Sequence, residues 1–380
     1  MTTIIKAANA ADFLALVPHL AGYTPSNSLV LVPFNGNRTL GVMRIDLPPA
    51  GDDHTDVDAL AATFIGMICK VSDVDGVTPV VFTDDAFCRD DDITHAPLVR
   101  ALMRRADTCG LHVADALCLA ADGWGSYLDP ECPPEGRPRS ELARELALPQ
   151  KRDVSADQNA GLELPHADRA AKERVGDALA AIDTAAQSVC AADQGARTSI
   201  AELNPMALAA VCAFDDVPSL FEDALRWDAA DLRPYDAAAL LWCLSRPSLR
   251  DVALSQWNAD IVAGDAALEA QLRWQDGEAY PDEIAMRMYG EGPQPDGHRL
   301  QRALDLVRAL AAVAPRAMRV GPLASAAWLS WALGHSTAAG FYVERARAID
   351  PHHGLTGIVA AFVDAGHLPE WAFERVLPRD

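Results

Sequence analysis

The residues with the clearest potential for ligand chemistry follow predicted strands in the first third of the chain. Arg44 and Asp46 lie on the second strand of a predicted hairpin, and Asp84 and Asp85 follow a β-branched strand. Ligands of open α/β sheets bind beside the carboxyl ends of strands. We therefore expect these side chains to border a pocket whose carboxylates hold a cation or a polar ligand.

A second candidate segment contains two aromatic residues and a hydroxyl group within four positions. Trp124, Ser126 and Tyr127 follow the last predicted strand of the same region. In a pocket, the two rings would form a stacking wall. The alternative interpretation is a turn that is anchored by two aromatics and flanked by exposed acids, and the sequence leaves both open.

Common catalytic signatures are absent from the sequence. None of the four lysines follows a G-x-x-x-x-G pattern, so there is no phosphate loop, and there is no H-E-x-x-H. The Gly123-Trp124-Gly125 segment lacks the third glycine of a dinucleotide fingerprint, and the spacing around Ser126 is not that of a nucleophile elbow. The sequence assigns no catalytic residue, no metal ligand and no cofactor.

Cysteine and histidine positions also suggest structural roles. The eight cysteines contain no C-x-x-C pair, which argues against a zinc knuckle or a thioredoxin-like site, and we expect most of them to be buried. His335, His352 and His353 fall between predicted helices, where an imidazole caps a helix or is solvated.

Charge and hydropathy narrow the classes of partner. The formal net charge is −22, whereas binding to nucleic acid or to an anionic bilayer needs a local excess of Lys and Arg. The short basic clusters at Arg104-Arg105 and at Arg137 with Arg139 lie beside acids and suggest solvated surfaces. Without a signal segment or a membrane-length apolar run, we expect a cytoplasmic protein that binds neither nucleic acid nor membrane.

The order of predicted elements indicates two domains. A mixed α/β or α+β domain with a small sheet is expected over residues 1–148, an irregular linker over 149–165, and an all-α domain over 166–380. The predicted elements of the first domain are a hairpin over 28–34 and 40–47, a helix over 57–71, a strand over 78–83, a helix over 96–109 and a strand over 111–120.

One segment of the helical domain resembles a tetratricopeptide-like helical hairpin. It runs from Ala327 to Pro351, with Gly334 between the two helices and small residues at Ala339 and Ala346. Glycine allows the left-handed conformation that ends a helix, and small residues allow close helix packing. Because a self-supporting solenoid needs about three such repeats, we expect one hairpin fused to other helices.

The sequence resembles a known family over nearly its whole length. The resemblance implies membership of the actinobacterial domain-of-unknown-function family 4192, whose description supplies no activity. The residues that carry it are Leu14 to Tyr23 with Pro25, Ser28 to Val32, Arg44 to Pro48, Trp124 to Leu128, Cys132 to Gly136, and Trp331 to Pro351.

Three functional hypotheses remain. The first is a protein-interaction or regulatory module that binds another protein through its helical domain. The second is a metal-assisted hydrolase or nucleotide-directed enzyme, which requires Asp46, Asp84 and Asp85 to converge in one cleft. The third is a small-molecule sensor that uses the same pocket without catalysis.

Overall fold

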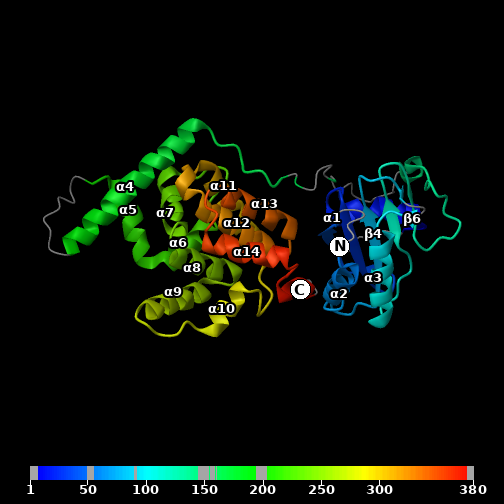
Figure 1. Ribbon diagram of the computed structural model, residues 1–380. Helices are drawn as coiled ribbons and strands as arrows, with labels where there is room; N and C mark the ends of the chain where they lie inside the picture. The colour runs from blue at the N-terminus through cyan, green and yellow to red at the C-terminus, as the bar shows by residue number, and fades with distance from the viewer. Residues whose placement is uncertain are drawn as a thin grey trace. The chain divides into compact units, whose positions relative to one another are not determined.

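The computed structural model divides the chain into two compact units. It describes residues 7–48, 55–89, 92–143, 154, 159, 161–193 and 203–374. One unit comprises residues 1–160 and 373–380, and the other comprises residues 161–372 (Figure 1). Most of the predicted linker 149–165 lies outside the described residues, and its last part belongs to the helical unit.

The first unit contains a six-stranded mixed sheet. Its strand order is β2-β1-β4-β7-β8, and β3 also pairs with β1. β4 and β7 are parallel, and the other pairings are antiparallel. The strands are β1 (Ser28–Asn35), β2 (Arg38–Thr39), β3 (Met43–Asp46), β4 (Gly76–Phe82), β7 (Leu117–Leu119) and β8 (Trp124–Ser126), and β5 (Cys88–Arg89) pairs with β6 (Asp92–Ile93) separately.

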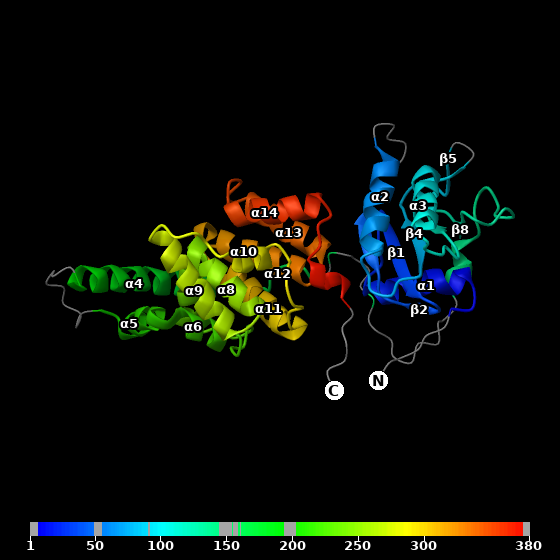
Figure 2. The same ribbon diagram turned by 90° about the horizontal axis from the view of Figure 1, so that it is seen from below.

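Helices cover the sheet because its central strands are apolar on both faces. Every residue of β4 is buried, which is typical of a strand between two layers. Helix α1 (Ala10–Ala21) packs through Leu14 and Val17 against Val30 and Val80. Helices α2 (Val57–Ile68) and α3 (Ala96–Thr108) pack side by side, and α3 contacts β4 (Figure 2).

Local signals in the sequence predicted most of these elements. The hairpin, the strand before Asp84 and the two helices α2 and α3 are confirmed, and Asp56 caps α2 by accepting a hydrogen bond from the amide of Ala59. Two predictions were wrong. The strand predicted over 111–120 is confined to Leu117–Leu119, and the predicted turn at Trp124 is strand β8, paired with β7.

The second unit is entirely helical over the residues that the structure describes. Proline lies at the first or second position of four of its helices, where a missing N–H group costs no hydrogen bond. The α-helices are α4 (Arg169–Asp193), α5 (Pro205–Cys212), α6 (Val217–Ala224), α7 (Pro234–Leu244), α8 (Pro247–Asn258), α9 (Ile261–Gln275), α10 (Asp282–Met288), α11 (Gly297–Val313), α12 (Val320–Ala332), α13 (Ser336–Arg347) and α14 (Gly354–Asp364).

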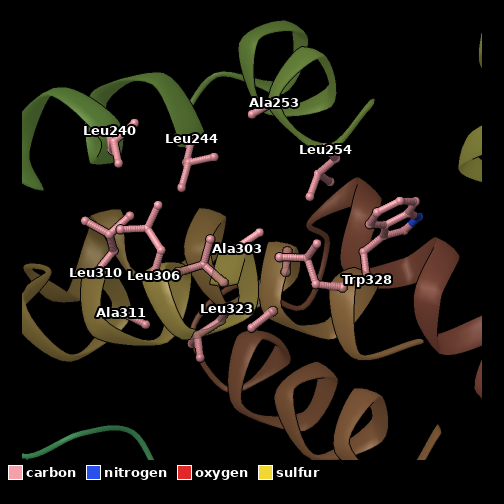
Figure 3. Packing of buried hydrophobic residues seen from close by; sticks show 14 of the residues in the cluster. Leu240, Leu244, Ala253, Leu254, Ala303, Leu306, Leu310, Ala311, Leu323 and Trp328 are labelled. Atoms are coloured by element: carbon pink, nitrogen blue, oxygen red, sulfur yellow. The ribbon is translucent and has the colours of Figure 1, made fainter. Parts of the chain in front are cut away.

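One apolar cluster holds these helices together. Figure 3 shows leucines of α7 and α8 directed toward α11, whose Leu306 and Leu310 point back toward α7, while Ala311 lies on the side of α12. Trp328 of α12 is completely buried in the same cluster. The second unit therefore has its own core, separate from the α1-side cluster of the sheet.

Helices α12 and α13 occupy the segment that resembles a tetratricopeptide hairpin. Gly334 between them has φ = 80°, the left-handed conformation that the sequence predicted. Ala339 and Ala346 are buried, and α14 packs against both helices. The relationship to tetratricopeptide repeats stays a prediction.

The described residues include no helix that is both long enough and apolar enough to cross a lipid bilayer.

Candidate functional site

A cleft of about 660 Å³ lies between α1 and the β7–β8 hairpin in the α/β unit. This volume is within the range of small-molecule sites. The cleft contains Trp124 and Ser126 of the predicted site, together with residues from three further segments. Its lining comprises Asn9, Ala10, Ala11, Asp12, Ala114, Asp115, Trp124, Ser126, Leu128, Asp129, Arg137 and Glu141.

Trp124 forms the apolar base of the cleft. Its ring packs in the cluster that contains Leu14 and Val17 of α1 and is only 5% exposed. Its indole Nε1 donates to the carbonyl of Pro138 at 3.2 Å, and the guanidinium carbon of Arg137 lies 5.5 Å from the ring centroid. The ring is therefore fixed from both sides, by packing and by a cation–π contact.

Ser126 and Asp115 form a fixed polar pair in the cleft. The Ser126 hydroxyl donates to Asp115 Oδ1 at 2.5 Å and accepts from the amide of Leu128 at 3.0 Å. The amide of Ala116 also donates to Asp115 Oδ1. These bonds compensate the burial of the hydroxyl and hold the carboxylate in one orientation.

Arg137 is the one cation among the lining residues, and a lining carboxylate already binds it. Its Nη2 donates to Asp129 Oδ2 at 2.6 Å. This bond, followed by the amide of Glu131, lowers the pKa of Asp129 below its usual value. As predicted, Arg139 is exposed, and it donates to the carbonyls of Ala120 and Ala121, whereas Arg137 is only partly exposed and lies over the ring of Trp124.

The lining has an excess of negative charge. Asp12, Asp115, Asp129 and Glu141 supply carboxylates, against the single guanidinium of Arg137. Oxygen acceptors beside an aromatic ring suit an ammonium or guanidinium group, which donates several hydrogen bonds and carries positive charge. The charge of the lining therefore favours a positively charged group.

Gly125 fixes the backbone of β8 behind the cleft. A Cβ atom at this position would lie 2.4 Å from Cys132 Sγ and 2.7 Å from Cζ of the Phe87 ring. Phe87 is itself completely buried. Only glycine fits there without displacement, so the segment around Trp124 and Ser126 is held against its neighbours on both faces.

Four of the other predicted site residues lie away from β8. Arg44 and Asp46 belong to β3 at the opposite edge of the sheet, and Asp84 and Asp85 follow β4 in its middle. The pairing register places Ser28 opposite both Asp46 and Phe82, so Asp46 and the Asp84-Asp85 turn share the carboxyl end of β4. Asp115 and Ser126 flank Leu117, the first residue of β7, at its amino end. The structure thus separates the predicted residues into two groups.

Asp46 and Asp84 each accept hydrogen bonds from residues close to them. Arg44, with a side chain only 7% exposed, donates to Asp46 Oδ1 at 2.5 Å and to Ser28 Oγ at 2.7 Å. Asp84 accepts from Asn27 Nδ2 at 2.8 Å and from Ser26 Oγ at 3.3 Å.

Asp85 and Tyr127 are also held locally. Asp85 Oδ2 lies 3.4 Å from Thr83 Oγ1 and 4.0 Å from His95 Nε2. The Tyr127 hydroxyl donates to the carbonyl of Thr94 at 2.6 Å, and burial raises its pKa well above the usual value. Tyr127 therefore connects β8 to the start of α3, and it does not line the cleft.

No metal site is formed by the part of the chain that the structure describes, because no three His, Cys, Asp or Glu side chains there are close enough to hold an ion. Among the three histidines between helices, His353 caps α14, whereas the side chain of His335, at the N-cap of α13, makes no capping bond. His353 Nδ1 accepts from the amide of Thr356, and its Nε2 lies 3.1 Å from Arg250 Nη1.

The sequence predicted two of the twelve lining residues of the cleft as site residues, Trp124 and Ser126. Asn9, Asp12 and Glu141 come from helices that carry no recognised ligand motif, and Asp115 precedes a strand of only three residues. The signal that could have found Asp115 is the β7–β8 hairpin, since pairing Leu117 with Ser126 brings that carboxylate to the hydroxyl.

Comparison with known proteins gives a family and no activity. The model of the family described as Domain of unknown function (DUF4192) matches residues 11–278 and 282–370. No curated protein and no solved structure matches the chain. The cleft must therefore be interpreted from its own chemistry.

Proposed function

The chain belongs to the family described as Domain of unknown function (DUF4192), and we propose that it is a regulatory recognition module whose α/β unit binds an ammonium or guanidinium group. The observation that carries this proposal is the excess of carboxylates around Trp124 in a cleft of ligand size. The cation is either the side chain of a Lys or Arg residue on a partner protein or a free organic amine.

The recognition proposal rests on how the polar groups are held. The Ser126–Asp115 and Asp129–Arg137 bonds preorganise the lining, so binding costs little further ordering. The metal-assisted hydrolase has less support, because Asp46, Asp84 and Asp85 are each engaged by separate neighbours. A small-molecule sensor would use the same cleft with a free amine as its ligand.

The proposal is tested by titrating the full chain with two cationic probes while following the indole N–H resonance of Trp124. One probe is spermidine, and the other is a nonapeptide with three arginines, compared with the same peptide containing citrulline. Saturable shifts with the arginine peptide alone support a protein partner, and shifts with spermidine support the sensor. A resonance that moves with neither probe contradicts the proposal.

A charge variant localises the binding to the cleft. Glu141→Gln removes one lining charge and should weaken cation binding about 2-fold to 5-fold, since exposed charge pairs contribute about 0.5–1 kcal/mol. Glu278→Gln, an exposed position of the helical unit, is the matched control and should leave the affinity unchanged. Equal losses in both variants would indicate non-specific attraction to the acidic surface.

The helical unit supports a second proposal, that it docks a protein. Trp274 and Leu272, near the end of α9, are 57% and 55% exposed, and large exposed apolar side chains are typical of interaction surfaces. A photo-crosslinker at position 274 should capture a discrete partner that a crosslinker at Val262, near the start of α9, does not. Identical products at both positions would contradict docking at the end of α9.

A further inference from the structure

Two exposed cysteines meet where α2 and α3 end. Cys69 is the C-cap of α2, and its amide donates to the carbonyl of Ile65. Cys109 is the C-cap of α3, and its amide donates to the carbonyl of Arg105. The helices pack side by side, and the two thiols are close enough to interact with each other.

Four of the eight cysteines are exposed, and this pair is among them. The sequence predicted that most cysteines would be buried, but only Cys118 and Cys243 are, and Cys69, Cys109, Cys190 and Cys212 are exposed. Burial raises the pKa of Cys118 and of Cys243 to about 12, so both stay protonated and inert at neutral pH. A reagent in solution can reach Cys69 and Cys109.

We propose that Cys69 and Cys109 are a reversible oxidation site, which a low-molecular-weight disulfide converts into an intramolecular disulfide between the ends of α2 and α3. The proposal is independent of the cation cleft. It requires two thiols in contact on packed elements and access for a small oxidant, and both conditions hold here.

The reaction is a double thiol–disulfide exchange. The Cys109 thiolate attacks one sulfur of the small disulfide, which forms a mixed disulfide and releases one small thiolate. The Cys69 thiolate then attacks the Cys109 sulfur, forms the Cys69–Cys109 bond and releases the second small thiolate. The protein thiols lose two protons and two electrons, and the small disulfide takes up both.

The surroundings of the pair determine how fast it reacts. Partial burial and the contact with Cys109 raise the pKa of Cys69. Because the thiolate is the nucleophile, exchange should be slow at pH 7 and should accelerate as pH rises toward 9. The pair would thus accumulate as a disulfide under sustained oxidation and would respond little to a brief exposure.

Oxidised glutathione is the probe, added to the full-length protein at pH 8. Mass spectrometry of the non-reduced digest should show the Cys69 peptide linked to the Cys109 peptide, with glutathione adducts at Cys190 and Cys212. In Cys109→Ser the link must disappear, and Cys69 should instead retain glutathione.

A stability measurement checks that the bond forms in the folded state. Linking the helix ends should raise the thermal midpoint of the α/β unit by about 5–10 °C, and a reductant should reverse the rise. Cys109→Ser should show no rise. Glutathione adducts at both Cys69 and Cys109 without a linked peptide would overturn the proposal, as would a linked peptide that forms only in denaturant.

Discussion

Glu222 illustrates at residue scale how charge is stabilised inside the helical unit. Its carboxylate accepts from Arg299 Nη1 at 2.7 Å and Nη2 at 2.5 Å, and from Gln256 Nε2 at 3.1 Å. The side chain of Arg299 is 12% exposed and that of Glu222 is 23% exposed. The bond to Arg299 is the main reason why the pKa of Glu222 is lowered to about 2. This ion pair joins α6 to α11.

The lowered pKa predicts a loss of stability in acid. The native pKa lies below the ordinary 4.5, so the contribution of Glu222 is complete above pH 4.5 and is lost as pH falls toward 2. Between pH 6 and pH 3, the free energy of unfolding should fall by about 2 kcal/mol through this group. Urea denaturation at several pH values should show that the free energy of unfolding of Glu222→Gln lacks this fall between pH 6 and pH 3.

A neighbouring surface pair is the control for Glu222. At pH 7, Glu222→Gln should cost about 2–3 kcal/mol, because Arg299 loses its charged partner in a half-buried site. Asp223→Asn removes an ion pair with Arg226 in which both side chains are more than 60% exposed, and it should cost less than about 0.5 kcal/mol. A Glu222→Gln profile with the wild-type pH dependence would contradict the assignment.

At residue scale, the sequence predicted the types of side chain in the site better than it predicted where each side chain lies. Trp124 and Ser126 line the cleft, whereas Arg44 and Asp46 lie on β3 at the opposite edge of the sheet. The general rule of strand carboxyl ends guided those assignments, but the cleft depends on an antiparallel edge strand and on α1. Asp115 could not be chosen among the 54 acidic residues without that pairing.

At element scale, a close helix approach depends on one glycine. Gly321 lies in the first turn of α12, where a Cβ atom would be 2.3 Å from the carbonyl oxygen of Leu244, the last residue of α7. Gly321→Ala should therefore lower the free energy of unfolding by about 2–3 kcal/mol, since a backbone atom must move. Chemical denaturation followed by circular dichroism measures the loss.

Another helical glycine provides the matched control. Gly357 of α14 is exposed and has no neighbouring atom within 4 Å of its Cβ position. Gly357→Ala should be neutral or stabilise the protein by up to about 1 kcal/mol, because alanine favours the helix. If the two alanine variants were equally stable, the packing of α12 against the end of α7 would not require glycine at position 321.

Element prediction succeeded where the signal was local. The hairpin at Asn35-Gly36-Asn37 and the cap at Asp56 are encoded within a few residues. Strand β8 was missed because it has three residues and its pairing partner is what makes it a strand. Helix α1 was not predicted as an element, although Asn9 caps it and Leu14, Leu16 and Val17 form its buried face.

At the scale of the whole molecule, the two units have different cores. The α1-side cluster of the sheet includes Leu14, Val80 and Trp124, and the large helical cluster extends from Val175 to Trp371. The acid excess is a property of the complete chain and contributes to solubility, but recognition of a cation would depend on the local lining of the cleft.

The continuous helical core predicts that residues 161–372 fold without the α/β unit. Their buried Trp257, Trp328 and Trp331 should give a near-ultraviolet circular dichroism signal, and heating should produce one cooperative transition. A fragment that ends at residue 319 lacks α12 and two of these tryptophans, so it should retain helical content but lose the near-ultraviolet signal. If the 161–372 fragment also lacked fixed aromatic packing, the helical unit would depend on the α/β unit for its folding, and the boundary between the units would not be a folding boundary.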